Sequence, residues 1–305
     1  MHTNSQPSIA ICVATFKRPE LLKDCIHAIG NIRLPSNYTV ILIIVDNDET
    51  KTGKTVAENE QERLSIPLYY YVQPDRGISS TRNTLIEKSI DHNVSYIAFI
   101  DDDELPHKDW LIEMLEGLQK YSADIVAGPV VPIRENTPLQ DYVLDEKHPS
   151  GTVPRNIPAG NVLFNIKLAN EYGLRFDRYF DFIGCEDFDF FDRAIKLNLK
   201  SVWINNAVVF EHITPDRETL KYIIFRHFTG GINVVMRHKK HHKTFTTWMR
   251  YLPKSIGKFF GAFFSLIKAI FSSRQENLKK SIIKAANGLG YLFGLCNMVI
   301  ERYRY

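Results

Sequence analysis

Four short runs of apolar residues recur in the first third of the chain, and each one ends at polar residues. The runs cover residues 8–14, 39–45, 68–72 and 95–100 and are rich in Ile, Val and Tyr. Nearly continuous apolar runs of this length are typical of strands that are buried on both faces. The pattern therefore predicts the core of a parallel sheet.

Polar stretches with helical character separate these runs, at about residues 19–30, 53–64 and 78–91. The third begins after Gly77, and Ser79 and Ser80 are suitable to cap it. Strands that alternate with helices indicate right-handed βαβ units and an α/β sheet.

Further along the chain, a helix is expected near 108–121 and a strand at 124–131. The stretch 132–159 is rich in proline and irregular, which is typical of a loop beside an active site.

The pattern changes after residue 216. Residues 218–238 read as a helix, and two apolar helices are expected at 252–271 and 278–300. Lysines interrupt their apolar runs, so neither reaches the roughly 20 apolar residues that a membrane-spanning helix needs. An aromatic face with lysines among it favours a helix that lies in a membrane interface. Packing on the rest of the chain, or on a protein partner, is the alternative.

Charge divides the chain at the same place. Residues 1–216 contain 21 Lys+Arg and 32 Asp+Glu, which is a net charge of −11. Residues 217–305 contain 17 Lys+Arg and 3 Asp+Glu, which is a net charge of +14, and the two parts add up to the total of +3. The larger part is acidic, so the chain is not a generic nucleic-acid binder and we expect no nucleic-acid partner. The basic part predicts contact with an anionic surface.

The four cysteines lie far apart and form no CxxC pair. Neither a disulfide framework nor a zinc cluster is indicated, which favours a reducing cytoplasm.

The residues that follow the apolar runs carry the candidate chemistry, because ligands of an open α/β sheet bind beyond the carboxyl ends of its strands. They are residues 15–20, 46–48, 74–83 and 101–104. The last is Asp-Asp-Asp-Glu, which is electrostatically costly unless a cation shares it. Mg²⁺ typically bridges one or two carboxylates to substrate phosphates. The alternative is that Glu104 is solvated and that some of the aspartates cap the following helix.

A set of motifs in order along the chain resembles the family 2 inverting glycosyltransferases of the GT-A fold. The motifs are ATFKRPELL at 14–22, VDND at 45–48, GISSTRN at 77–83, FIDDDE at 99–104, PAGNVLF at 158–164, GCEDFDFFDR at 184–193 and VVFEHITP at 208–215. The basic tail resembles bacterial surface-polysaccharide glycosyltransferases of the succinoglycan type.

The resemblance implies a Rossmann-like, nucleotide-sugar-binding α/β fold, with a mixed but mostly parallel sheet flanked by helices and C-terminal amphipathic helices. Residues 1–216 would be the catalytic domain, with a nucleotide-sugar half at about 8–104 and an acceptor half at about 105–216. Residues 217–305 would be a basic helical region that associates with membrane.

The resemblance also implies roles for individual residues. Asp187 would be the general base, and Asp103 and His212 would hold Mg²⁺ or Mn²⁺. His212 is equally compatible with a hydrogen-bonded loop histidine. Gly160, Asn161 and Glu186 would bind the acceptor. The nucleotide sugar would contact Thr15, Phe16, Arg18, Glu20, Asp46, Arg82, Asp101 and Asp102, with Asp46 facing the base and Asp101 the ribose.

These roles fit the chemistry of sugar transfer from a nucleotide sugar. A divalent cation neutralises the leaving diphosphate, and one carboxylate takes the proton of the attacking hydroxyl. The expected donor is UDP-linked, and the expected acceptor is a glycan or a polyprenyl-diphosphate-linked glycan in surface polysaccharide synthesis. The expected location is cytoplasmic, peripheral on the inner face of the cell membrane and in contact with anionic lipid.

Two other classes of protein compete with this interpretation. A sugar nucleotidyltransferase uses a related sheet and Mg²⁺, but it needs a glycine-rich loop after the first strand, where residues 14–20 have no glycine. A non-catalytic, membrane-associated nucleotide-sugar-binding protein would keep the pocket without a base, and the Glu186–Asp187 pair disfavours it.

Overall fold

The computed structural model describes residues 6–134, 148–154, 156–272 and 274–301. Much of the predicted loop at 132–159 therefore lies outside the described residues. The chain forms two compact units. The first comprises Met1–Asp181 and Glu186–His212, and the second comprises Phe182–Cys185 and Ile213–Tyr305. The division after His212 lies near the position 216 that charge alone marks.

The first unit contains a seven-stranded sheet and a small three-stranded sheet. The large sheet has the strand order β3 (Leu68–Val72), β2 (Thr39–Asp46), β1 (Ser8–Thr15), β4 (Tyr96–Asp101), β8 (Asn161–Asn165), β6 (Ile125–Ala127) and β9 (Ser201–Trp203). The small sheet has the order β5 (Glu104–Pro106), β10 (Val209–His212) and β7 (Val130–Ile133).

Parallel register brings the ends of the first strands together. Thr15 at the end of β1 pairs with Asp46 on β2, and Ala14 pairs with Asp101 on β4. The polar residues that follow these strands therefore gather at one edge of the sheet.

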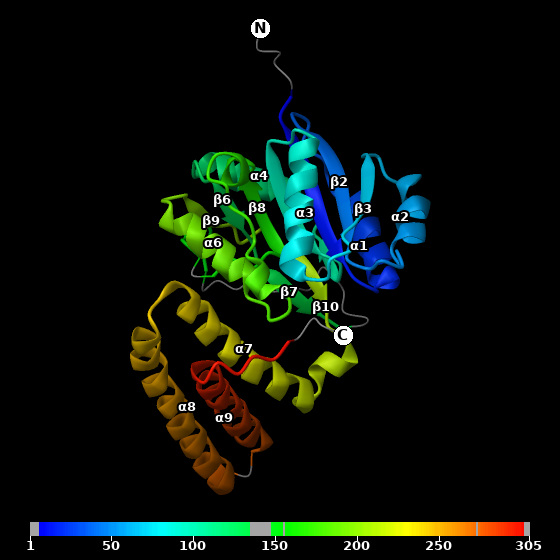
Figure 1. Cartoon of the computed structure of the whole chain (residues 1–305). Helices are drawn as coiled ribbons and strands as arrows, with labels where there is room; N and C mark the ends of the chain where they lie inside the picture. The colour runs from blue at the N-terminus through cyan, green and yellow to red at the C-terminus, as the bar shows by residue number, and fades with distance from the viewer. Residues whose placement is uncertain (1–5, 135–147, 155, 273, 302–305) are drawn as a thin grey trace. The chain divides into compact units, whose positions relative to one another are not determined.

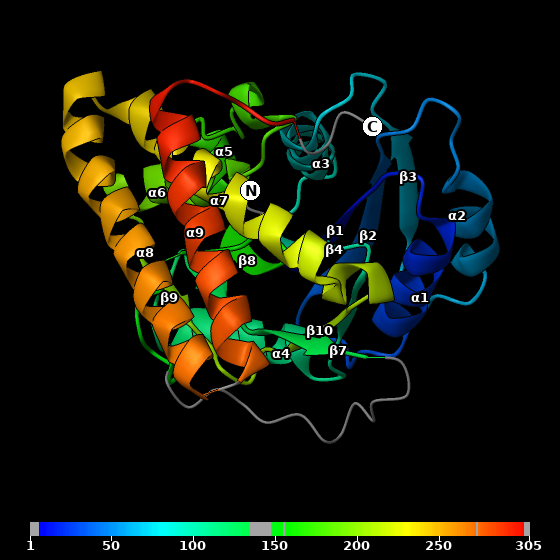
Figure 2. The same cartoon turned by 90° about the horizontal axis from the view of Figure 1, so that it is seen from below.

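Helices cover both faces of the large sheet. They are α1 (Pro19–Gly30), α2 (Lys54–Gln61), α3 (Ile78–Asp91), α4 (Trp110–Lys120), α5 (Lys167–Asn170) and α6 (Glu186–Lys196), with a 3₁₀ turn at Arg178–Phe180. Alternate residues of each strand point to opposite faces. Ile9 and Ile11 pack with α1 and α4, whereas Ala10 and Cys12 pack in the core that includes α3, α5 and α6. The two helical layers are visible in Figure 1 and Figure 2.

The single strand predicted at 124–131 is in fact two strands in different sheets. The break falls at Gly128 and Pro129, between β6 and β7. A Cβ on Gly128 would lie 2.1 Å from the carbonyl oxygen of Ala207, so the chain passes very close to its neighbour there. Proline has no N–H to continue a ladder. The strand consequently leaves one sheet and joins the other.

Strand β8 is a central strand that the apolar pattern alone does not predict. Its apolar core is only Val162–Phe164, between Asn161 and Asn165. It pairs antiparallel with both β4 and β6, and so makes the sheet mixed. A run this short with asparagine at each end looks like a loop in the sequence.

The second unit contains three long helices, α7 (Leu220–His241), α8 (Thr244–Ser272) and α9 (Gln275–Leu295), after a 3₁₀ turn at Pro215–Glu218. Helix α9 packs closely on α7 through glycines, since a Cβ on Gly290 would lie 2.1 Å from the carbonyl oxygen of Phe228. Lys239 of α7 donates to the carbonyl oxygen of Gly294 at the end of α9, at 3.0 Å.

Helix α8 begins eight residues before the predicted start at 252 and continues through Pro253. Its first turns are held by the buried side chains of Thr247 and Tyr251. Tertiary packing thus outweighs the helix-breaking tendency of the proline. Across the described part of the chain, none of the helices combines the length and hydropathy needed to cross a membrane.

Candidate active site

Three aspartates at the end of β4 form the centre of the candidate site. Thr15 donates its hydroxyl proton to Asp102 Oδ2 at 2.8 Å. The guanidinium of Arg18, at the start of α1, lies 3.2 Å from Asp102 Oδ1 and 3.3 Å from Asp103 Oδ2. The ends of β1 and β4 are therefore joined by a hydrogen bond and two ion pairs, all between residues that the sequence predicts for donor or metal binding.

Burial raises the pKa values of two carboxyl groups in this acidic cluster. The pKa of Asp102 is raised to about 7, chiefly by burial; Arg18 opposes the shift, and Asp103 adds to it. Burial, followed by the charge of Asp101, also raises the pKa of Glu104. Glu104 is buried and accepts a hydrogen bond from the backbone N–H of Asp101 at 2.9 Å. The alternative of a solvated Glu104 is therefore wrong.

Arg82 connects the end of β4 to helix α6. Its guanidinium lies 3.0 Å from Asp101 and also pairs with Glu186. The side chains of Arg82 and Glu186 are each only 7% exposed. Residues predicted for donor binding, Asp101 and Arg82, and a residue predicted for acceptor binding, Glu186, therefore belong to one connected network, although they are far apart in the chain.

Glu186 and Asp187 begin α6 side by side. The pKa of Glu186 is raised to about 7 by burial, with Arg82 lowering it and Asp187 raising it. The pKa of Asp187 is also raised by burial, against the lowering effect of Arg82. Asp187 is partly exposed, and its carboxylate accepts from the N–H of Phe188 at 2.7 Å. A fixed, partly accessible carboxylate with a raised pKa suits a general base.

His212 lies beside the aspartates at the level of the backbone, because its N–H donates to the carbonyl oxygen of Asp103 at 3.1 Å. No group of three or more His, Cys, Asp or Glu side chains among the described residues has the arrangement of a metal site. A Mg²⁺ site of the usual kind requires only one or two carboxylates, because substrate phosphates and waters complete it. The oxygen donors at Asp101–Asp103 fit such a cation.

The carboxylate of Asp46 accepts hydrogen bonds from three groups of the fold itself. It is fully buried, and it accepts hydrogen bonds from the Tyr70 hydroxyl at 2.7 Å, the Gly53 N–H at 2.9 Å and the Asp48 N–H at 3.0 Å. Its contact with the base of the nucleotide stays a prediction. These hydrogen bonds hold the turn that leads to α2.

Asn161 is likewise a structural residue here. Its amide donates to the carbonyl oxygens of Pro129 and Ala207, both at 2.8 Å, and its oxygen accepts from Trp110 Nε1 at 2.8 Å. The side chain is fully buried, and its contact with an acceptor stays a prediction. Gly160 is required by close packing, since a Cβ there would lie 2.4 Å from Glu104 Oε1.

Of the other two predicted donor residues, Phe16 lies in the turn before α1 and Glu20 lies in the first turn of that helix. Phe16 stacks under the guanidinium of Arg76, whose carbon is 4.2 Å from the ring centroid. Glu20 is exposed in the first turn of the helix. Their contact with a nucleotide remains a prediction.

Three residues that sequence reasoning missed shape the loop before α3. Asn47 accepts from the Gly77 N–H at 2.8 Å and donates to the carbonyl oxygen of Asp75 at 2.9 Å. Asp181, rather than Ser79 or Ser80, caps α3, because it accepts from the N–H and the hydroxyl of Ser80 at 2.8 and 2.9 Å. The third, Arg76, lies in the same polar stretch as Arg82. The position of Asn47 in the VDND motif could have identified it as a site residue. Asp181 could not be identified in this way, because it lies 101 residues from Ser80 in the sequence.

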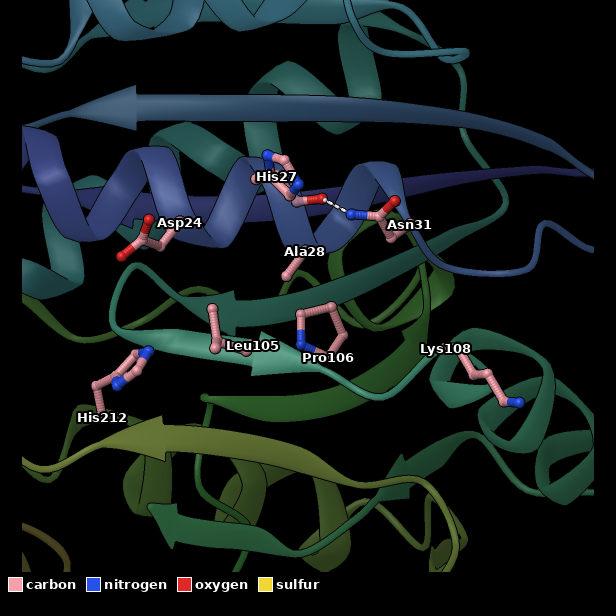
Figure 3. A pocket seen from close by; sticks show the side chains of 8 residues that line it. All are labelled: Asp24, His27, Ala28, Asn31, Leu105, Pro106, Lys108 and His212. Carbon is pink, nitrogen blue, oxygen red and sulfur yellow. Dashed lines mark hydrogen bonds between the residues drawn. The ribbon is translucent and has the colours of Figure 1, made fainter. Parts of the chain in front are cut away.

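A pocket of about 410 Å³ lies between α1 and the small sheet. Figure 3 shows His212 and Asp24 at one end and Lys108 at the other. The lining residues are Asp24, His27, Ala28, Asn31, Leu105, Pro106, Lys108 and His212. Of the predicted site residues, only His212 lines this pocket, and the aspartates of the candidate site do not. We therefore assign no catalytic step to it.

The family model described as Glycosyl transferase family 2 matches residues 10–195, which include every acidic residue of the network described above. The chain therefore belongs to glycosyl transferase family 2 and is a glycosyltransferase. The predicted family and the predicted enzyme class are confirmed.

Individual relatives agree with this assignment. The chain is 27% identical to the succinoglycan biosynthesis protein ExoM of Rhizobium meliloti, over 75% of this chain and 74% of that protein. It is 26% identical to the glycosyltransferase AglE of Haloferax volcanii, over 42% of this chain and 41% of that protein.

Solved structures confirm the predicted GT-A fold. The mannosyltransferase PcManGT of Pyrobaculum calidifontis, in complex with GDP-Man and Mn²⁺, superposes with a TM-score of 0.63 at 13% identity, covering 96% of this chain and 88% of that one. TarS of S. aureus in complex with UDP-GlcNAc superposes with a TM-score of 0.54 at 11% identity, covering 93% and 89%.

Proposed function

We propose that this glycosyltransferase is metal-dependent and inverting, and that it moves a sugar from a UDP-linked donor to a glycan or polyprenyl-diphosphate-linked acceptor in bacterial surface polysaccharide synthesis. The observation that carries the proposal is the network from Asp101 through Arg82 to Glu186, which brings the acidic strand end together with the carboxylate pair.

The donor site consists of the residues at the ends of β1 and β4. Thr15 and Arg18 hold Asp102 and Asp103 in place, and Asp101 is turned toward Arg82. UDP-GlcNAc in TarS supports a uridine nucleotide, whereas GDP-Man in PcManGT shows that the fold also accepts guanosine. A test of donors must therefore include both nucleotides.

Asp103, with His212 beside it, would hold Mg²⁺ or Mn²⁺, and the Mn²⁺ in PcManGT supports this choice. The cation supplies positive charge to the leaving diphosphate.

Asp187 takes the proton from the attacking acceptor hydroxyl. The hydroxyl oxygen forms a bond to the anomeric carbon on the face opposite the diphosphate, and the bond from that carbon to the diphosphate oxygen breaks. The anomeric configuration inverts, so an α-linked donor gives a β-linked product. Glu186, whose Oε1 accepts from Arg82, would bind acceptor hydroxyls beside the base.

We place the enzyme in the cytoplasm, peripheral on the inner face of the membrane. The basic character of residues 217–305 and their apolar helices support this location. A lipid-linked acceptor would be available at that surface.

The test is Asp187→Asn, compared with Asp192→Asn, which makes the same change elsewhere on α6. Calorimetry with UDP and Mn²⁺ should give equal donor affinity for both variants and the unaltered protein. Turnover should fall by about a hundredfold or more in Asp187→Asn only, because a general base typically contributes that much. Unchanged turnover in Asp187→Asn would remove it as the base.

A further inference from the structure

Helix α8 turns its large apolar side chains outward. Phe245, Met249, Phe260, Phe263, Phe264 and Phe271, here called the α8 apolar face, are each 57–86% exposed. At 3.6 residues per turn they fall within about 100° of the helix circumference. This face runs the length of a 29-residue helix, which is about 44 Å.

The inward side of the same helix consists mostly of small and polar residues, with the buried Tyr251 as the large exception. Ser255 donates to the carbonyl oxygen of Gly288 on α9 at 2.8 Å, and the carbonyl oxygen of Ala262 accepts from Ser281 at 2.8 Å. Ser265 accepts from Lys284 at 2.9 Å. A helix of a water-soluble bundle buries its aromatic side and exposes its polar side. Helix α8 does the reverse, so its apolar side is built for a non-aqueous surrounding.

The charges around the α8 apolar face are of one sign. Residues 219–275 contain no Asp or Glu. The exposed cations Arg250, Lys254 and Lys268 lie along one flank of the face, next to Phe264 in the helical projection. A second copy of this unit would bring like charges together, which opposes self-association through this flank. An anionic surface is the complementary occupant.

We propose that the α8 apolar face docks in the interfacial layer of a membrane that contains anionic lipids. The apolar face enters the boundary between headgroups and acyl chains, and the Arg250 flank contacts the lipid phosphates. Helices α7 and α9 pack with α8 in this unit and fix the side that it presents. This inference deepens the peripheral location proposed above and rests on it, but it is independent of the chemistry at Asp187.

The test is flotation of the full chain with vesicles of phosphatidylcholine, with and without phosphatidylglycerol. The double variant Phe260→Ser, Phe263→Ser should bind anionic vesicles at least about a hundredfold more weakly, because a buried phenylalanine contributes tenfold or more. The matched control is Leu278→Ser, Leu289→Ser on α9, whose leucines are 45% and 43% exposed. The control should float like the unaltered protein.

A second variant tests the charged flank. Arg250→Gln, Lys254→Gln, Lys268→Gln should reduce binding to anionic vesicles by about a hundredfold and leave binding to pure phosphatidylcholine unchanged. Because all the altered side chains are exposed, circular dichroism should be the same for every variant.

Equal flotation of the phenylalanine variant and its leucine control would overturn the proposal. So would a dimer of the unaltered protein that the phenylalanine substitutions dissociate, because the face would then bind a second copy. Asp187→Asn should float normally, so that loss of flotation and loss of transfer are separate outcomes.

Discussion

Replacing Arg82 by methionine should destabilise the protein in a pH-dependent manner. Methionine keeps much of the aliphatic volume of the side chain but removes the charge that Glu186 and Asp101 share. Glu186 would then be a buried carboxylate without its cation. Asp101 is 41% exposed, so that solvent screens its charge and its contribution is small.

The magnitude follows from the burial of the Arg82–Glu186 pair. Breaking a buried ion pair by removing one partner typically costs about 3–5 kcal/mol. The pKa of Glu186 is already raised to about 7 by burial, above its ordinary value of 4.5. A carboxyl group with a raised pKa destabilises the fold as the pH rises above 4.5, and loss of Arg82 raises this pKa further. The cost should therefore be about 3 kcal/mol at pH 8, and about 1 kcal/mol at pH 5, where Glu186 is protonated in both proteins.

Urea unfolding at pH 5 and pH 8 measures this difference, with Glu186→Gln and the double variant completing a cycle. In the Glu186→Gln background, Arg82→Met should cost about 1 kcal/mol at either pH, because no buried charge remains to be left unpaired. A cost that is the same at pH 5 and pH 8 in the unaltered background would refute the reasoning.

Two further predictions concern the base and the loop before α3. Turnover should fall on acidification with an apparent pKa above 4, the ordinary value for an aspartate, because burial raises the pKa of Asp187. Arg82→Met should move this acidic limb of the pH–rate profile to higher pH. A pH–rate profile whose acidic limb is at the ordinary pKa and does not move in Arg82→Met would contradict both statements. Gly77→Ala should lower the stability by about 2–4 kcal/mol, since its φ is +144° and a Cβ would lie 2.2 Å from Asp181, whereas Gly257→Ala, which has open space around it, should cost nothing in a thermal unfolding experiment.

Strands and helices with strong local signals could be predicted closely from the sequence. Helices α1 and α3 have the predicted bounds, 19–30 and 78–91, and β3 matches residues 68–72. Their apolar runs are continuous and polar residues end them. The gathering of Thr15 and Asp101 also follows from the sequence, because parallel strands end at one edge of a sheet.

Features that depend on distant contacts could not be predicted. The Arg82–Glu186 pair joins residues 104 positions apart, and the break at Gly128 depends on the backbone of Ala207. The family motifs pointed to Asp46 and Asn161 as ligand-binding residues. Only the structure shows that their polar atoms are already hydrogen-bonded inside the fold.

The sequence left two orientations of α8 open, an apolar face toward a membrane interface or an apolar face packed on the rest of the chain. Its helical period is plain in the sequence, but the usual rule would bury the phenylalanines. Contacts of Ser255 and Ala262 with α9 show that the opposite side is buried.

The most direct test of the central claim is a panel of UDP- and GDP-sugars, in which release of the nucleoside diphosphate is measured with Mg²⁺ or Mn²⁺. We predict turnover of a UDP-sugar that stops with a chelator and falls at least about a hundredfold in Asp103→Asn, since the aspartate holds the cation that neutralises the leaving group. Release that is unaffected by both the chelator and Asp103→Asn, or none from any sugar nucleotide, would contradict metal-dependent transfer from a nucleotide sugar.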